Sequence, residues 1–505
     1  MWVRLEGNDV KRLHRLDGLA NAFESVEQER SRDVPMERLL MYQSGSLRRW
    51  LGWFLPAVLW AVTFVSPLRA EDNNVPANAP AGVLVSPDGV LRLQTAADPL
   101  GTVMRDRVAA ARQALPPDII RFSRLRKVSL PRLERAIIAA NGVVSDEMRY
   151  MAGLLRVRYV FVYPESGDIV LAGPAEGWVP DPTGRVVGIT SGKPVIQLQD
   201  VVTALRAYPS GREGPAVIGC SIDPTQEGLA KMQEFLRRMG GTFPRGQEFQ
   251  TARYMSTGVK NSLGLQEITI EGIPADTHFA RILVEADYRM KLIGIGLEKP
   301  PVRLTSFVEK AASSAVAANA LFRWYFVPDY QCLRVTEDGM GLELVGDGVK
   351  LVGEDEVVMS GGARAQAATS NAASRAFTTS FTKKYPELAA RSPVYAELRN
   401  VIDLAVVAAY IQKQDFYTQA NWKMEFLGDE SKFPVRTYPA PKQVESAVNA
   451  IIKGSRIMTP IGGGVQIEAE EALQAENLLP DEGNEVRKLH EEVKVSLPAD
   501  TWWWD

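Results

Sequence analysis

The chain has 505 residues, of which 46% are hydrophobic, and this is enough for two or three domains with buried cores. The 58 Lys and Arg residues and 61 Asp and Glu residues give a net charge of −3. This balance argues against a nucleic-acid-binding surface, which needs a basic stripe. No uncharged run of eighteen residues occurs after residue 70, so no membrane span is expected there.

An export signal is the clearest feature of the first seventy residues. Arg48 and Arg49 precede an uncharged apolar run from Trp50 to Ser66, and Ala70 is the small residue at a cleavage site before Glu71. The run is slightly shorter than the roughly 20 residues of a bilayer span, and a glycine and a proline interrupt it. Residues 41–70 are therefore predicted to be a signal peptide, and the protein is expected to be exported, either periplasmic or secreted.

Residues 1–40 have mixed charges and no long apolar face, so they fit neither a signal nor a folded unit. We interpret them as an upstream extension, with translation starting at Met41 or Met36. A membrane anchor with a small cytoplasmic head and a twin-arginine leader remain the alternatives. Residues 71–82 are rich in Pro, Asn and Ala and predict a linker.

Three apolar segments broken by turn residues predict antiparallel strand pairs in an α+β fold. Their turns lie at 87–89, at 164–167, and in a longer segment at both 338–339 and 347–348. Helices are expected after Ser129, after Asp223, and after a capping box formed by Ser306 and Glu309. The stretch 266–297 predicts a strand, a helix and a strand, which makes a β-α-β unit.

The C-terminal half is expected to centre on one apolar helix over 392–413, buried along Leu398, Ile402, Ala405 and Ala409. A further helix is predicted to end at Gly454. Gly462–Gly464 predict a hairpin tip or bulge, because no helix start or Lys follows to bind phosphate. Beyond 468 the chain is acidic.

These patterns predict several small mixed units of β-hairpins and packed helices. Their expected bounds are 83–210 for an N-terminal α+β unit, 211–300 for the β-α and β-α-β unit, 301–470 for a C-terminal α+β domain and 471–505 for an acidic tail. Cys220 and Cys332 fall in different units, so they are predicted to remain unbridged, although export would permit a disulfide.

The segments 276–296, 394–411 and 457–467 resemble motifs of a large family of exported proteins from planctomycete bacteria. That family carries a domain of unknown function, and the resemblance covers roughly 80–470. It implies an exported, uncharacterised bacterial protein and provides no catalytic residues.

No motif in the sequence predicts a catalytic, cofactor or metal site. His278 stands at a helix start beside Asp276, which we expect to cap it, while Glu285 and Asp287 are expected on other faces of that helix. Arg399 and Asp403 are four residues apart and predict an ion pair along the apolar helix. Together with Asn400 they could instead face a binding cleft, and Glu397 is a further acid on the same helix.

Trp502, Trp503 and Trp504 are the most unusual feature, because large aromatic side chains seldom remain in water. We predict that they dock on the body of the protein as a short extended segment. Docking on a partner is the alternative, and these tryptophans are therefore candidate interaction residues.

Two classes of function remain open from the sequence. The first is a non-catalytic scaffold or binding module of the cell envelope, with an envelope protein as its partner. The alternative is an exported hydrolase whose active site is assembled from residues distant in sequence. A deep pocket in which two or more carboxylates or a Ser/His pair converge would favour the hydrolase.

The layout from Arg48 to Ala70 predicts that the protein isolated from its native source begins at Glu71. N-terminal sequencing of the exported form checks this. Finding residues 1–40 attached to that form would contradict it.

Overall fold

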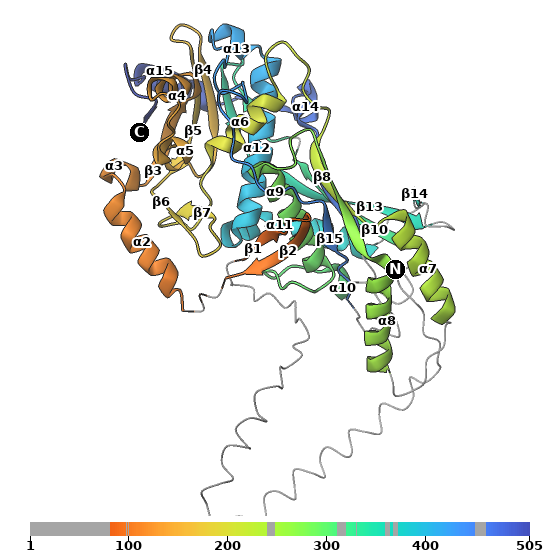
Figure 1. Cartoon of the computed structure of the whole chain (residues 1–505). Coiled ribbons are helices and arrows are strands. Elements are labelled where there is room, and N and C mark those ends of the chain that lie inside the picture. The colour runs from red at the N-terminus through yellow and green to blue at the C-terminus, as the bar shows by residue number, and fades with distance from the viewer. Residues whose placement is uncertain are drawn as a thin grey trace, which may run out of the picture. The chain divides into compact units, whose positions relative to one another are not determined.

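The computed structural model describes residues 81–96, 98, 100–239, 248–310, 320–329, 331–358, 364–366, 372–449 and 461–505, all within one compact unit (Figure 1). The predicted extension, the signal peptide and most of the linker lie outside these residues. The fold is α+β, as predicted, with two large mixed sheets and a small two-stranded one.

The first sheet has nine strands in the order β1-β2-β15-β9-β8-β16-β10-β13-β14. Neighbouring strands are antiparallel except at β2–β15 and β16–β10, which are parallel. The bounds are β1 (Ala81–Val85), β2 (Val90–Thr95), β8 (Ile218–Asp223), β9 (Leu265–Glu271), β10 (Ala320–Pro328), β13 (Val349–Val358), β14 (Arg364–Gln366), β15 (Gln443–Glu445) and β16 (Ile461–Ile467).

The second sheet has seven strands in the order β17-β11-β12-β4-β5-β3-β18, with only β17–β11 parallel. The bounds are β3 (Ser123–Ser129), β4 (Tyr159–Tyr163), β5 (Asp168–Ala175), β11 (Leu333–Val335), β12 (Gly341–Leu344), β17 (Leu478–Pro480) and β18 (Trp503–Trp504). A separate pair consists of β6 (Trp178–Pro180) and β7 (Val186–Gly188).

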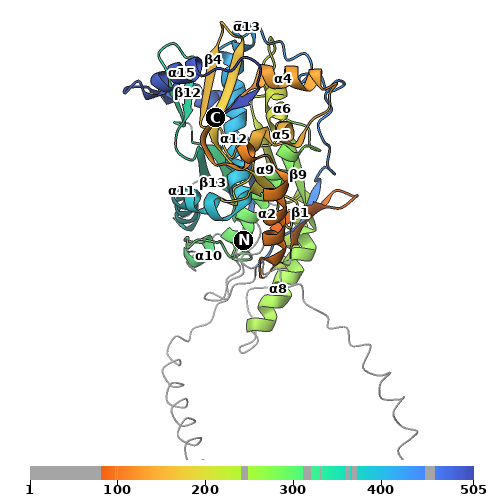
Figure 2. The same ribbon diagram turned by 90° about the vertical axis from the view of Figure 1, so that its left-hand side faces the viewer.

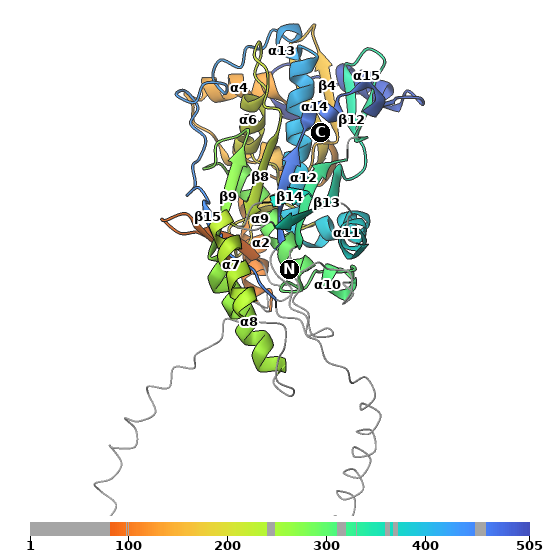
Figure 3. The ribbon, with the colours of Figure 1, turned by 90° about the vertical axis from the view of Figure 1, so that its right-hand side faces the viewer.

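Helices cover and connect the two large sheets. The longer ones are α2 (Thr102–Ala114), α4 (Leu130–Ala139), α6 (Leu198–Ala207), α7 (Gln226–Met239), α8 (Glu248–Leu263), α9 (His278–Gly294), α11 (Ala372–Arg391), α12 (Pro393–Lys413) and α15 (Glu485–Val495). Single turns form α3 (Pro117–Ile120), α5 (Asp146–Arg149), α10 (Phe307–Lys310), α13 (Phe416–Gln419) and α14 (Ala469–Ala472). Figure 2 shows α15 at the same end of the molecule as β4 and β12, and Figure 3 shows α7 and α8 side by side away from α12.

Helix α12 lies between the two large sheets (Figure 1). Pro393 occupies its first turn, where the missing N–H does no harm. From Val394 to Ile411 every residue except Arg399 is buried, so the helix is enclosed on all sides. It packs on α6, α9 and α11, and one apolar cluster joins it to strands of both sheets. The prediction of a central buried helix is confirmed.

Other local predictions are also confirmed. The hairpins β1–β2, β4–β5 and β11–β12 form as expected. Ser129 caps α4, and Ser306 and Glu309 make both hydrogen bonds of a capping box. Cys220 and Cys332 are buried free thiols, Cys220 in the nine-stranded sheet and Cys332 beside β11 of the other.

Some local predictions are wrong because long-range pairing decides them. The turn at 347–348 does not form a hairpin, since β12 stays in the seven-stranded sheet while β13 pairs with β10 in the other. The strand expected after α9 is not formed, because the helix continues to Gly294. The segment after Pro441 begins with the strand β15 instead of a helix, and Gly454 lies outside the described residues.

Gly462–Gly464 are the start of a central strand and not a hairpin tip. In β16 they lie between β10 and β8, whose backbones approach closely. A Cβ on Gly463 would lie 2.0 Å from the carbonyl oxygen of Trp324, and one on Gly464 would lie 1.8 Å from that of Cys220. Glycine is required at both positions because another backbone occupies the side-chain space.

The predicted sequence ranges contribute jointly to these sheets. The nine-stranded sheet contains strands from all three predicted ranges, 83–210, 211–300 and 301–470. Its first strand, β1, begins two residues before the first range, at Ala81. The main apolar cluster runs from Val83 to Leu473. All three predicted ranges therefore contribute to one main core, while α7 and α8 form a separate apolar cluster.

The C-terminal tryptophans dock as an extended segment, as predicted. Trp503 and Trp504 pair antiparallel with Val128 and Lys127 at the edge of the seven-stranded sheet. Arg126, whose side chain is fully buried, donates hydrogen bonds of 2.9 and 3.0 Å to the Asp505 carboxylate. Its guanidinium also lies 4.6 Å from the Trp503 ring centroid, within cation–π range.

We predict that Leu398→Ala lowers the free energy of unfolding by about 2–5 kcal/mol, because the side chain is fully buried in the core. The control is Leu100→Ala, at a side chain that is 77% exposed, which should change it by about 0.5 kcal/mol or less. Urea unfolding measures both. Equal effects of the two substitutions would contradict this account of the core.

Deleting residues 501–505 should lower the free energy of unfolding by about 3–5 kcal/mol, because the buried Arg126 guanidinium then loses its ionic partner. Thermal and urea melts of the truncated protein measure the change. A truncated protein that melts like the full chain but no longer binds an envelope partner would instead make the tryptophans a recognition tag.

Candidate functional site

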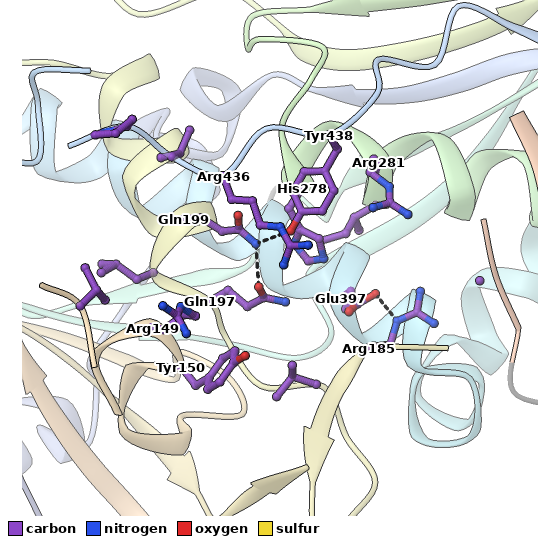
Figure 4. A pocket seen from close by; sticks show the side chains of 18 of the residues that line it. Arg149, Tyr150, Arg185, Gln197, Gln199, His278, Arg281, Glu397, Arg436 and Tyr438 are labelled. Carbon is purple, nitrogen blue, oxygen red and sulfur yellow. Dashed lines mark hydrogen bonds and ion pairs between the residues drawn. The ribbon is translucent and has the colours of Figure 1, made fainter. Parts of the chain in front are cut away.

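A pocket of about 800 Å3 lies where segments far apart in the sequence meet. Its walls come from β1, the turn before β7, the starts of α6 and α12, the first two turns of α9 and the segment 432–438 (Figure 4). The segment after α4 and the end of α5, with Arg149 and Tyr150, complete them. This volume is within the range of small-molecule sites.

One wall of the pocket is a network of buried ion pairs. Arg185, beside β7, donates to Glu285 of α9 at 2.9 Å and to Glu397 of α12 at 2.7 Å. Arg289 lies 3.5 Å from Glu285 and 2.7 Å from Glu298. Burial raises the pKa of Glu397, and the charge of Arg185 only partly opposes this. Burial alone would lower the pKa of Arg185, but Glu285 and Glu397 outweigh it and raise that pKa.

His278 and Asp200 form a hydrogen-bonded pair at the start of α9. Thr277 caps the helix through its hydroxyl, so the predicted cap by Asp276 is wrong. The Nδ1 atom of His278 lies 2.9 Å from the Asp200 carboxylate, and the imidazole is 16% exposed. Burial lowers the pKa of His278, but Asp200 outweighs this by charge and hydrogen bond, so the net shift of the pKa is upward. The Glu397 charge acts in the same upward direction.

Arg281 and Arg436 each lie against the ring of Tyr438, with guanidinium carbons 4.8 and 5.1 Å from its centroid. Gln199 donates to the Tyr438 hydroxyl at 3.1 Å, and the Tyr438 amide donates to the carbonyl of Asp276 at 2.8 Å. Arg281 also donates to the carbonyl of Val83. Among the described residues, no acidic side chain is within ion-pair distance of either arginine. Neither guanidinium group is therefore neutralised by a carboxylate in the described part of the chain.

Arg399, Asn400 and Asp403, the candidates from the sequence, do not line this pocket. The predicted Arg399–Asp403 pair is not observed, since each side chain has a partner from another segment. Arg399 donates to Asp347 at 3.2 Å and Asp403 accepts from Arg156 at 2.8 Å. Asn400 donates to the carbonyl of Leu155 at 2.9 Å. These residues join α12 to its surroundings, and Glu397, one turn earlier, is the one that lines the pocket.

The spacing on α9 contained a signal that we misinterpreted. His278, Arg281 and Glu285 are separated by three and four residues, so all three share one helix face and line the pocket. The expectation that Glu285 lies on another face is wrong, because seven residues make nearly two full turns. Asp287 does lie elsewhere, paired with Lys291 at 2.7 Å, and burial raises its pKa to about 6.

Helical spacing gives no such signal for Arg185, Arg436 and Tyr438. They come from irregular segments, whose position in the pocket depends on the whole fold. In the described part of the chain, no group of three or more His, Cys, Asp and Glu side chains could hold a metal ion.

Residues 220–307 match a family described as "Protein of unknown function (DUF1598)". The matched segment includes His278, Arg281 and Glu285, so it supplies one wall of the pocket. The resemblance to proteins with a domain of unknown function is confirmed for this segment. Searches of curated proteins and of solved structures found no match.

The His278–Asp200 pair predicts a pH-dependent contribution to stability. Because the folded pKa is raised above the ordinary value of 6.5, the contribution is fully present below pH 6.5 and is lost as pH rises through the folded value. The difference in unfolding free energy between wild type and His278→Gln should therefore shrink at alkaline pH. Urea melts across pH 5–9 measure it, and a difference that grows with pH would contradict the assignment.

Proposed function

We propose that the protein is an exported, non-catalytic binding protein whose pocket holds a small organic anion. The observation that supports this is the pair Arg281 and Arg436, which point into one pocket without acidic partners among the described residues. Guanidinium groups bind carboxylate and phosphate groups with paired hydrogen bonds.

The surroundings of the two arginines favour binding over a purely structural role. Tyr438 is fixed by Gln199 and by a backbone hydrogen bond, so the ring on which both guanidinium groups lie is held in place. A site that is ordered before the ligand arrives loses less conformational entropy on binding.

Export is supported by the sequence from Arg48 to Ala70. No helix in the described ranges has the length and hydrophobicity needed to cross a membrane. We place the protein in the periplasm or outside the cell, where an envelope protein could receive the bound anion or the tryptophan segment.

Isothermal titration calorimetry with succinate, citrate, glutarate and inorganic phosphate tests the binding proposal. Arg281→Gln and Arg436→Gln should each weaken binding about tenfold or more, because each removes charge-assisted hydrogen bonds. The control is Arg238→Gln, at an exposed arginine on α7, which should bind like wild type. Binding that is unaffected by both pocket substitutions would refute the proposal.

An exported hydrolase is a second candidate, because Glu285 and Glu397 converge in the pocket beside His278 and Asp200. The pocket lining contains no Ser or Cys, so His278 would have to activate a water molecule. Assays with simple esters, glycosides and phosphodiesters separate the two functions. Turnover of one of these substrates that is lost in His278→Gln would favour the hydrolase. If none of the substrates is hydrolysed, the result favours the binding protein.

A further inference from the structure

We infer that the ligand is a zwitterion, an amino acid or a short derivative of one, with its anionic group on Arg281 and Arg436 and its protonated amine at Glu285 and Glu397. This inference rests on the proposed binding function and specifies the class of ligand.

The charges of the buried wall do not balance. The ion-pair network contains three carboxylates, those of Glu285, Glu298 and Glu397, and only two guanidinium groups, those of Arg185 and Arg289. All five side chains are at most 10% exposed. With all three carboxylates ionised, one negative charge is in excess in a region shielded from water, where an unpaired charge is strongly unfavourable.

His278 is a further group whose charge acts on Glu397. His278 is paired with Asp200, so even a protonated imidazole is balanced by its own carboxylate. Asp181 lies near enough to Arg185 to add a further negative charge to its surroundings. Burial raises the pKa of Glu397, as expected of a carboxylate that lacks full compensation.

Only part of the network is accessible to a ligand. Glu285 and Glu397 line the pocket, whereas Arg289 and Glu298 do not. A cation in the pocket would therefore meet the two carboxylates that share Arg185. An ammonium group offers three donors for such oxygen atoms.

The positive and negative groups occupy different parts of the pocket. Figure 4 shows Arg281 and Arg436 to either side of Tyr438 and His278, with Glu397 and its partner Arg185 below them. A ligand with one charge of each sign can satisfy both parts, while a simple anion leaves the acidic wall uncompensated.

The test compares probes that differ only in the amine. Titration calorimetry at pH 7 on the full folded chain measures glutamate, glutarate and N-acetylglutamate. Glutamate should bind at least tenfold more tightly than the other two. The comparison uses the wild-type protein, so it does not depend on whether a variant folds.

Glu397→Gln should reduce the preference for glutamate over glutarate to less than threefold, because the amine loses one of its two carboxylates. The control is Glu234→Gln, at an exposed acid on α7, which should keep the full preference. Circular dichroism melts establish that both variants are folded.

The possible outcomes separate the two proposals. Glutarate binding as tightly as glutamate, with loss of affinity in Arg281→Gln, would overturn the zwitterion and leave the anion-binding function intact. Failure of all three probes while succinate, citrate or phosphate binds would overturn the zwitterion alone, and failure of every probe would overturn both proposals. A preference for glutamate that persists in folded Glu397→Gln and Glu285→Gln variants would also overturn the assignment of the amine.

Discussion

The burial of α12 is the constraint on which the rest of the structure depends. A helix enclosed on every side cannot carry charged residues unless each one meets a partner brought by another segment. Glu397 meets Arg185 and Asp403 meets Arg156, so burial of the helix requires two arginines that are distant in sequence. Packing of the core and assembly of the charged wall are consequently the same event.

The pocket follows from this arrangement. The first turn of α12 presents Glu397 beside Glu285 of α9, because the two helices pack against each other. The β6–β7 pair then supplies Arg185 between them. The opposite side is built from Arg436 and Tyr438, in a segment without regular structure that is held by hydrogen bonds to α6 and to Asp276. A rigid acidic wall therefore faces a basic side formed partly by irregular chain.

Local features were predictable from the sequence, and features that depend on distant partners were not. The hairpin turns, the capping box at Ser306 and the buried stripe of α12 require only neighbouring residues. The course of β16 straight through its glycines could not be predicted, because these glycines are explained by the backbones of β10 and β8, which come from elsewhere in the chain. For the site, the shared face of His278, Arg281 and Glu285 was available from helical spacing. The contacts of Arg185 and the packing of Arg281 on Tyr438 join residues that are far apart in the sequence, so no local pattern predicts them.

The strand β18 affects whether two copies of the protein can pair through the edges of their sheets. An edge strand such as β3 presents a row of backbone amide and carbonyl groups that can pair with any other exposed strand, and open edges of this kind promote aggregation. The short Trp503–Trp504 strand occupies part of that edge, and its bulky rings and the acidic Asp505 beside it hinder the approach of a further strand. At this edge, the final residues act as a covering that keeps one molecule from continuing the sheet of the next.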